Sequence, residues 1–259
     1  MIASSELSPL ARMLRPMGAL LTRYFDAEVA GLERAPAGAA LLVGNHNAGT
    51  ATPDSFVFGH AWLARFGEAA VPVSLGHDLL FRVPLGARLA SQLSIVPAKH
   101  GYAEEALSRG RKVLVYPGGQ HEALRPSRDR DRIDFGGHRG YVRLALRCGV
   151  PIVPVVAAGA HDGWYVVSRG DAIGRRWPLR RWLRLETAPL AFGLPTGVVF
   201  PYWPHLPLPR KMLIELLDPI TLAGDPRDPE AVAAGDLRVR EAMQRALDRL
   251  VGRLPRSQR

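Results

Sequence analysis

The sequence predicts an α/β protein with a mostly parallel central sheet flanked by helices. Two observations support this fold class. Short apolar runs bounded by glycine, proline or asparagine recur along the chain, and segments with apolar residues at helical spacing lie between them. Strands that alternate with helices form βαβ crossovers, and such crossovers build a parallel sheet covered by helices on both faces.

The individual elements follow from these two patterns. Each apolar run is short and rich in valine, isoleucine, leucine or alanine, as expected for buried strands. The intervening segments include 54–66, where Phe58 and Trp62 are spaced for one face of a helix. The expected strands are 39–45, 70–76, 93–98, 112–119 and 150–156, and the expected helices are 54–66, 78–92, 103–109 and 138–148.

Two further helical segments flank this unit. Between Leu10 and Phe25 the apolar residues form one stripe with arginines outside it, which predicts an N-terminal amphipathic helix. This helix either packs against the domain or lies on a bilayer surface. Near the C-terminus, Met243, Leu247 and Leu250 recur at helical spacing and predict a packing helix. We therefore divide the chain into an N-terminal segment, a main domain and a C-terminal helix, at 1–37, 38–222 and 223–259.

The segment 161–209 has an unusual composition and is interpreted as an insert in the main domain. It holds four of the five tryptophans, with arginines close by. Aromatic side chains interleaved with arginine suit a membrane interface, and they equally suit stacking on nucleic-acid bases. The residues concerned are Trp164, Trp177, Trp182 and Trp203, with Arg175, Arg176, Arg180, Arg181 and Arg184.

Length and charge limit the function classes further. The chain has 259 residues and a formal net charge of +10, which favours polyanions such as nucleic acids, anionic lipid headgroups or coenzyme A. Its single cysteine, Cys148, excludes an intramolecular disulfide. The longest nearly apolar run, at 149–160, is too short and too rich in proline for a membrane-spanning helix. Arginines interrupt the N-terminal periodic segment, so no secretory signal is expected.

The stretch LLVGNHNAGTATPD, residues 41–54, contains the first candidate site. His46 follows an apolar strand, where the loops of parallel sheets carry side chains over a crevice. A histidine there can accept a proton near neutral pH when a carboxylate orients its ring and stabilises the imidazolium. Asp54 is the nearest candidate for that carboxylate. A structural histidine and an acid that caps a helix are the alternatives.

The stretch KVLVYPGGQHEALRP, residues 112–126, contains the second candidate site. Its strand ends in a tight turn with Gly118 and Gly119, whose backbone amides could approach an oxyanion or a phosphate closely. Glu122 and Arg125 follow, and Arg125 could bind a phosphate or pair with Glu122. A plain connecting loop is the alternative.

Four blocks in order carry a resemblance to a known family. The blocks are Asn45 and His46 with Asp54, then LSIVPA, then VYPGGQHE, then GVPIVPV. Together they resemble the glycerolipid acyltransferase superfamily, which includes bacterial lysophosphatidate acyltransferases, and most of all its diacylglycerol and monoacylglycerol acyltransferase-like branch. The superfamily's first block is usually NHxxxxD, whereas eight positions separate His46 and Asp54 here. The similarity runs from about 38 to 158.

The resemblance implies a reaction and a set of site residues. His46 would be the general base and Asp54 its orienting partner, with Asn45, Gly118, Gly119, Glu122 and Arg125 at the substrate site. The acceptor hydroxyl would attack the thioester of acyl-CoA or of acyl carrier protein. Either donor would be a co-substrate, so the resemblance implies no cofactor and no metal. No G-x-S-x-G nucleophile motif occurs, which fits direct transfer. Phosphate-recognising members carry an arginine in the second block, where this chain offers Lys99.

The resemblance also implies partners and a location. The acceptor would be a glycerolipid such as lysophosphatidate, mono- or diacylglycerol, and the protein would contact an anionic membrane surface peripherally, on its cytoplasmic face. No nucleic-acid partner is then expected. Two alternatives stay open on the residues alone: a basic nucleic-acid-binding α/β protein, and a thioester or ester hydrolase that uses the same base to activate water.

Overall fold

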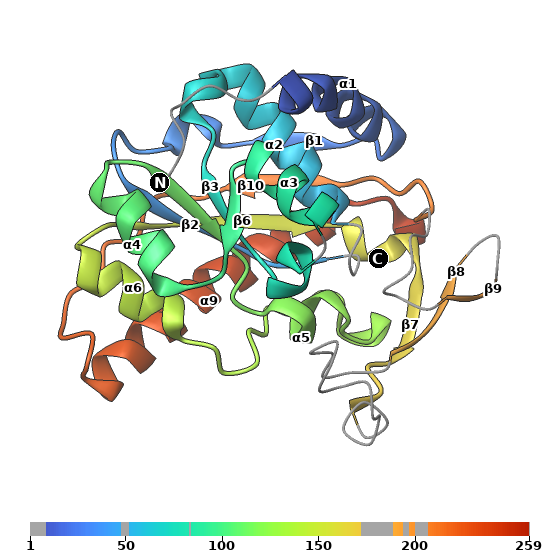
Figure 1. Ribbon diagram of the computed structural model, residues 1–259. Coiled ribbons are helices and arrows are strands. Elements are labelled where there is room, and N and C mark those ends of the chain that lie inside the picture. The colour runs from blue at the N-terminus through green and yellow to red at the C-terminus, as the bar shows by residue number, and fades with distance from the viewer. Residues whose placement is uncertain are drawn as a thin grey trace.

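The computed structural model describes residues 9–47, 52–82, 84–171, 189–193, 197–199 and 207–258. The arginines expected in the insert, together with Trp177, Trp182 and Trp203, lie outside these ranges, and of the insert's tryptophans Trp164 is described. Figure 1 shows a layered α/β arrangement, with a central sheet between two groups of helices and a smaller sheet at one side.

The central sheet has seven strands in the order β1-β10-β6-β2-β5-β3-β4. All neighbouring strands are parallel except β10 and β6, which are antiparallel. The mostly parallel sheet predicted from the sequence is therefore confirmed. The strands are β1 (Glu28–Ala30), β2 (Ala40–Gly44), β3 (Val73–Gly76), β4 (Ile95–Pro97), β5 (Lys112–Val115), β6 (Ile152–Ala158) and β10 (Leu213–Leu216).

Five of these strands, β2 to β6, match the five apolar runs. The sequence analysis missed β1 and β10, which pair with each other in parallel at one end of the sheet. Each has only three or four residues, too few for a clear alternating pattern. β1 lies within the segment 1–37, so the N-terminal segment contributes a strand to the sheet of the main domain.

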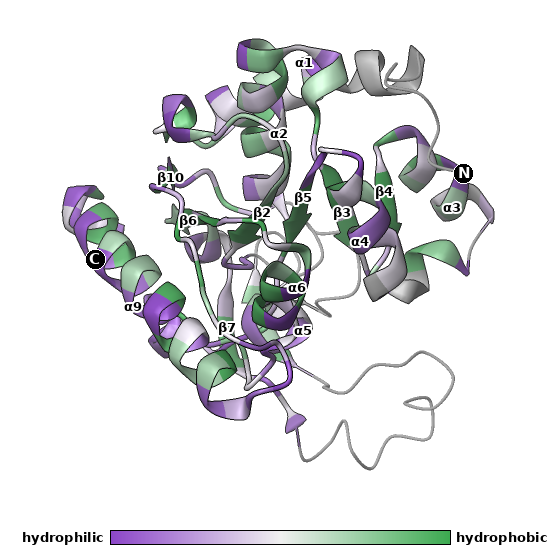
Figure 2. Ribbon diagram, turned by 90° about the vertical axis from the view of Figure 1, so that its left-hand side faces the viewer, coloured by the Kyte–Doolittle hydropathy of each residue, from purple (hydrophilic) through white to green (hydrophobic). Residues whose placement is uncertain are grey.

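Helices cover both faces of the sheet because its strands are apolar on both sides. Leu41 and Val43 of β2 pack with residues of α4, α6 and α9, whereas Ala40 and Leu42 pack with residues of α1 and α2. Figure 2 shows the resulting hydrophobic colour over β2 and β5. The helices are α1 (Pro9–Tyr24), α2 (Pro53–Phe66), α3 (Pro84–Gln92), α4 (His100–Ser108), α5 (Gly119–Ala123), α6 (Gly140–Cys148) and α9 (Pro229–Arg253).

Two expected elements end differently in the structure. The helix expected at 78–92 is divided into a short 3-10 helix, Asp78–Phe81, and α3, which begins at Pro84. Proline has no backbone N–H for the preceding turn, so it suits the first turn of a new helix. The strand expected to run to residue 119 ends at Val115, and α5 begins at Gly119.

The N-terminal helix α1 packs against α2. Gly18 allows this close approach, because a Cβ atom at that position would lie 2.6 Å from Cβ of His60. Met17 and Leu20 of the apolar stripe remain 45% and 61% exposed. Across the part of the chain that the structure describes, no helix combines the length and the apolar character needed to cross a bilayer.

A small antiparallel sheet lies beside the main sheet and contains the described part of the insert (Figure 1). Its inner side chains, Val166 and Ala191, are buried in a separate cluster with Ala123, Leu124 and Trp164. Its strands are β7 (Tyr165–Ser168), β8 (Leu190–Gly193) and β9 (Gly197–Val199).

Candidate active site

The two sequence stretches with candidate residues meet at one edge of the sheet. β2 and β5 are parallel neighbours, so their carboxyl ends lie side by side. His46 follows β2 by two residues, and the turn with Gly118 follows β5. Lys99 follows β4 at the same edge but is exposed, and β5 and β3 separate its strand from β2. At about 4.8 Å between neighbouring strands, β4 lies about 14 Å from β2.

His46 is held through its main chain by residues of the second stretch. Its backbone N–H donates to Oε2 of Glu122 over 2.8 Å, and its carbonyl oxygen accepts from Nη1 of Arg125 over 2.7 Å. Its imidazole ring lies against the ring of Tyr116, with the centroids 4.9 Å apart. Nδ1 is buried and has no hydrogen-bond partner among the residues described. The position of the ring is therefore set by contacts to the backbone of His46 and by aromatic packing.

Asp54 begins α2 and lies close to the same loop, but it does not hold the imidazole directly. Its Oδ1 accepts from the backbone N–H of Ser55 over 2.9 Å, and its Oδ2 accepts from Nδ2 of Asn47 over 3.1 Å. The sequence analysis expected a hydrogen bond from His46 to Asp54, and the described residues contain none between these two side chains. Asn47, which immediately follows His46, donates its side-chain amide to the Asp54 carboxylate where the imidazole was expected.

The electrostatics of this loop favour a neutral imidazole. Burial lowers the pKa of His46 from 6.5 to about 4, and the positive charge of Arg125 contributes in the same direction. Burial raises the pKa of Asp54 from 3.8 to about 6, against the effect of its hydrogen bonds from Asn47 and Ser55. At neutral pH, His46 is thus neutral and Asp54 is mostly ionised.

Glu122 is fully buried beneath the double-glycine turn. Burial raises its pKa from 4.5 to about 8, with Arg125 opposing the shift. Gly118 is required above it, because a Cβ atom there would overlap the Glu122 side chain. The amide of Gly119 donates to the carbonyl oxygen of Tyr116 over 3.1 Å within the turn. Glu122 therefore contacts the backbone of His46, and the amide of Gly119 has its hydrogen-bond acceptor within the protein.

Arg125 has a structural position that differs from the expected phosphate contact. Its side chain is 4% exposed, and its guanidinium donates to the carbonyl oxygens of His46, Glu122 and Arg130 and to Oδ1 of Asn47. Every guanidinium nitrogen therefore has a partner within the protein. The expectation that Arg125 binds a substrate phosphate does not fit this arrangement. The hydrogen bonds of its guanidinium fix the loop after β2.

Asn45 also has a structural position, although it was expected at the substrate site. It is 1% exposed. Its Nδ2 donates to the carbonyl oxygen of Ala157 over 2.9 Å, and its Oδ1 accepts from the N–H of the same residue over 2.8 Å. Both ends of the amide are thus occupied by the backbone of β6, so Asn45 ties the end of β2 to its neighbouring strand.

Sequence reasoning missed two residues of this loop region, Asn47 and Tyr116. Asn47 connects Arg125 to Asp54, and its place next to His46 was the signal that could have found it. Tyr116 packs on the ring of His46 and accepts a hydrogen bond from Oγ of Ser55 over 2.9 Å. Gly44 leaves room for the Tyr116 ring, because a Cβ atom at that position would overlap it. No sequence pattern connects positions 44 and 116, which become neighbours only when β2 pairs with β5.

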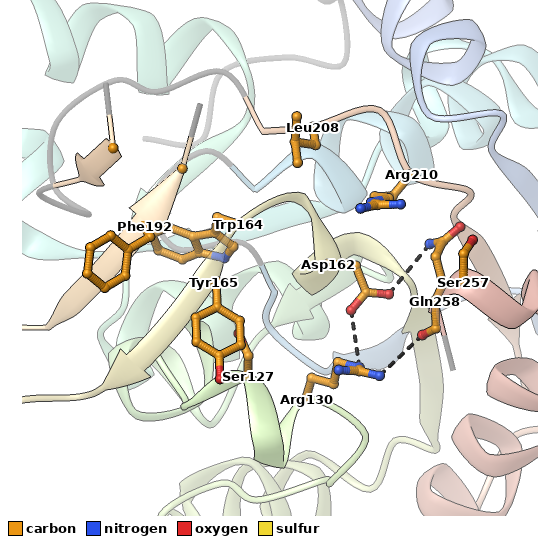
Figure 3. Close-up of a pocket in the computed structure, with 12 residues that line it drawn as sticks. Ser127, Arg130, Asp162, Trp164, Tyr165, Phe192, Leu208, Arg210, Ser257 and Gln258 are labelled. Carbon is orange, nitrogen blue, oxygen red and sulfur yellow. Dashed lines mark hydrogen bonds and ion pairs between the residues drawn. The ribbon is translucent and has the colours of Figure 1, made fainter. Parts of the chain in front are cut away.

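His46 lines neither of two cavities that the described residues form. One, of about 200 Å³, includes Glu122 and Arg125 in a lining that is otherwise rich in charged side chains. The other, of about 420 Å³, lies between the small sheet and the C-terminal end of the chain (Figure 3). The charged residues that line the smaller cavity are His121, Glu122, Arg125, Arg128, Asp129, Arg132, Asp134, Arg169 and Asp171.

Comparison with known proteins identifies relatives over most of the chain. Residues 26–158, just over half of the chain, match the protein family described as Acyltransferase. An uncharacterized protein of Mycobacterium tuberculosis is 30% identical over 233 residues, which cover 88% of this chain and 62% of that protein. A human protein named DGAT1/2-independent enzyme synthesizing storage lipids is 30% identical over 189 residues, covering 69% of this chain and 55% of that protein. The chain thus spans less than two thirds of the length of these relatives.

A solved structure has the same fold. The crystal structure of PlsC, the 1-acyl-sn-glycerophosphate (LPA) acyltransferase of Thermotoga maritima, superimposes with a TM-score of 0.56. The match covers 93% of this chain and 80% of that chain at 19% sequence identity. The mostly parallel sheet with helices on both faces is therefore an arrangement that the two proteins share.

Proposed function

Since the chain belongs to the Acyltransferase family, we propose that it transfers a fatty acyl group from an acyl thioester to the hydroxyl group of a glycerolipid. The thioester is carried by coenzyme A or by acyl carrier protein. The acceptor is of the class of lysophosphatidate, mono- or diacylglycerol. Relatives named for storage-lipid synthesis and for diacylglycerol acylation, the latter a human protein 23% identical over 146 residues, support this choice of acceptor.

In the proposed reaction, the neutral imidazole of His46 takes the proton of the acceptor hydroxyl. The hydroxyl oxygen attacks the thioester carbonyl, and the resulting tetrahedral intermediate collapses with cleavage of the carbon–sulfur bond. The proton then passes from the imidazolium to the departing thiolate, so the products are an ester and a free thiol. No acyl group is attached to the protein, and the chemistry requires no redox partner.

Asp54 has the second role in this proposal. A carboxylate stabilises the imidazolium that forms in the transition state, provided that it is ionised. The hydrogen bonds from Asn47 and Ser55 favour that ionised form against the effect of burial. In the proposal Asp54 acts on the imidazolium through its charge, since no hydrogen bond joins the two side chains among the described residues.

One observation carries the proposal: the first and third sequence blocks are joined at His46. The backbone of His46 bonds to Glu122 and to Arg125, which both belong to the stretch after β5. These contacts lie beyond the carboxyl ends of adjacent parallel strands, which is where α/β proteins bind their ligands. In the proposal, these contacts fix the backbone that carries the reactive imidazole.

The location in the proposal is the cytoplasmic face of a membrane, with peripheral contact. The acceptor is a membrane lipid, and the formal net charge of +10 favours an anionic surface. The donor, in contrast, is water-soluble. An enzyme that joins the two must work at the boundary between water and lipid.

Transfer is tested with purified protein, an acyl-CoA and each candidate acceptor, with the products identified by mass spectrometry. We expect the acyl chain on the glycerolipid and free coenzyme A in equal amounts. His46→Ala is expected to reduce turnover by at least about a hundredfold, the usual contribution of a general base. His138→Ala is the matched control, because His138 is exposed and lines neither of the two cavities.

Three outcomes contradict the proposal. Wild-type turnover in a folded His46→Ala protein excludes His46 as the base. Release of free fatty acid without a new ester indicates a hydrolase. Binding of nucleic acid that decreases steeply with salt, without any cleavage of the thioester, indicates a nucleic-acid-binding protein.

A further inference from the structure

The small sheet exposes a row of large apolar side chains on its outer face. Tyr165, Phe192 and Val198 are 60%, 42% and 64% exposed. Phe192 pairs with Tyr165 on one side and with Val198 on the other, so the three side chains are neighbours across β7, β8 and β9. Val167 and Leu190, which are 40% and 45% exposed, extend this outer face along the strands. Such a contiguous apolar surface on a soluble domain indicates a site of interaction.

The larger cavity adjoins this face and shares two residues with it. Tyr165 and Phe192 line the cavity of about 420 Å³ together with Trp164 and Leu208. Figure 3 shows Phe192, Trp164 and Tyr165 together on the left of the cavity, Leu208 above them, and most of the polar residues on the right. The polar residues are Ser127, Arg130, Asp162, Arg210, Ser257 and Gln258. The cavity thus has an apolar wall that continues onto the protein surface and a polar wall inside.

The two arginines of the polar wall differ in their partners. Arg130 forms an ion pair with Asp162, with 3.2 Å between Nε and Oδ1, and donates to the carbonyl oxygen of Gln258 over 3.3 Å. Arg210 is drawn in Figure 3 without an interaction to the other residues shown. Its Nε is buried and has no hydrogen-bond partner among the described residues. Nε of Arg130 is likewise buried without a hydrogen-bond partner among these residues, but it forms ion pairs with Asp131 and Asp162. The charge of Arg210 favours the ionised form of Asp162, and its Nε keeps a donor that no described residue accepts.

We propose that the outer face of the β7–β9 sheet docks on an anionic membrane and that the adjoining cavity takes the phosphate group of a phospholipid at Arg210. Arginine matches phosphate oxygens through its planar donors. Tyrosine and tryptophan beside apolar residues are typical of the interface between water and lipid. The net charge of +10 complements an anionic surface and not a neutral one. The inference extends the proposed function, since it rests on a lipid acceptor drawn from that membrane.

The proposed docking site is also separate from the loop that carries His46. The cavity contains no residue of the His46 loop, and its link to that loop is indirect. Ser127 in the cavity accepts from the N–H of Val166, and Arg130 accepts from Arg125, which holds the carbonyl of His46. Variants at the sheet face can therefore be tested for binding without changing the catalytic loop.

The test measures binding to vesicles in the absence of any acyl donor, so that its result does not depend on acyl transfer. The full chain is sedimented with phosphatidylcholine vesicles that contain phosphatidylglycerol, and with pure phosphatidylcholine vesicles. We expect binding to the anionic vesicles. The pair Tyr165→Ser and Phe192→Ser is expected to weaken it by about tenfold or more, since both substitutions remove apolar area from the contact. Arg210→Gln is expected to weaken it about fivefold, as for one basic residue near an anionic surface.

Two matched controls use similar residues elsewhere. Leu237→Ser changes an apolar side chain of α9 that is 50% exposed, and Arg88→Gln changes an exposed arginine of α3. Both are expected to bind vesicles as the wild type does. Circular dichroism of each variant checks that the protein remains folded.

Several vesicle-binding results overturn the proposal. These are wild-type binding by the sheet variants, loss of binding by the controls, equal binding to both kinds of vesicle, and loss of binding on changing Met17 and Leu20 of α1 while the sheet variants still bind. A soluble source of phosphate is distinguished by thermal shift with inorganic phosphate and with coenzyme A. If either stabilises the wild type and not Arg210→Gln, while vesicle binding is unaffected by that substitution, the cavity takes a soluble phosphate and the lipid assignment is wrong. Acyl transfer without vesicle binding would overturn this inference alone.

Discussion

The guanidinium of Arg125 donates a hydrogen bond to the backbone carbonyl oxygen of His46, with 2.7 Å between nitrogen and oxygen. The same guanidinium reaches Asn47, which in turn holds the carboxylate of Asp54. One buried cation thus connects the loop after β2 to the turn after β5. Four predictions follow from this connected set of residues and from the packing around it.

Replacing Arg125 by lysine is expected to lower the free energy of unfolding by about 3 kcal/mol. A lysine ammonium is a compact charge and cannot reproduce the several directed hydrogen bonds of the buried guanidinium. Arg128→Lys is the matched control, because the side chain of Arg128 is 79% exposed and it should change stability by less than about 0.5 kcal/mol. Chemical denaturation measures both, and equal stability of the two variants would contradict the structural role of Arg125.

Glu122→Gln is expected to flatten the pH dependence of stability between pH 6.5 and 8. In the wild type the pKa of Glu122 is raised to about 8 in the folded state, from 4.5. Between these values the folded protein keeps a proton that the unfolded chain loses. The free energy of unfolding therefore falls as pH rises, by at most about 1.4 kcal/mol per pH unit.

Between pH 6.5 and 8, Glu122 is expected to dominate the pH dependence of the free energy of unfolding. Of its neighbours, Asp54 titrates between 3.8 and about 6, and His46 between about 4 and 6.5, so both lie below the range. Denaturation curves of wild type and Glu122→Gln at several pH values give the two slopes. Parallel slopes would show that Glu122 is ionised in the folded protein at neutral pH.

Gly44→Ala is expected to destabilise the protein by about 1–3 kcal/mol, as overpacking of a core does. The added Cβ would overlap the ring of Tyr116, which must then move away from the ring of His46. Gly59→Ala is the control: it lies inside α2 with open space around its position, and alanine favours a helix over glycine by up to about 1 kcal/mol. Thermal unfolding of both variants measures the change in stability. A Gly44→Ala protein as stable as the wild type would refute the close contact between Gly44 and the Tyr116 ring.

Asn47→Ala is expected to shift the acid side of the kcat/KM profile to higher pH. The hydrogen bond from Asn47 lowers the pKa of Asp54, which burial otherwise raises. Without that bond the carboxylate stays protonated up to a higher pH and lacks the charge that, in the proposed reaction, stabilises the imidazolium. A pH–rate profile measured at acceptor concentrations well below KM tests the shift. An unchanged acid side would mean that Asp54 ionisation does not govern the rate.

The sequence by itself determined the fold class and the order of its central elements. Five short apolar runs predicted β2 to β6, and β2 and β6 are buried at every position, as strands apolar on both faces are expected to be. Local pattern also placed His46 and the double-glycine turn at strand ends. These features depend on neighbours within a few residues, which a sequence shows directly.

The tertiary structure alone decided which partners those residues have. Asn45 bonds to Ala157, and Arg125 bonds to the backbone of His46, over separations of 112 and 79 residues. Both residues looked available for substrate in the sequence, because a polar side chain near a glycine turn does not reveal its burial. Once strands far apart in the chain are paired, each buried donor must find a partner, and that requirement assigned Asn45 and Arg125 to holding the end of β2 and the loop that follows it.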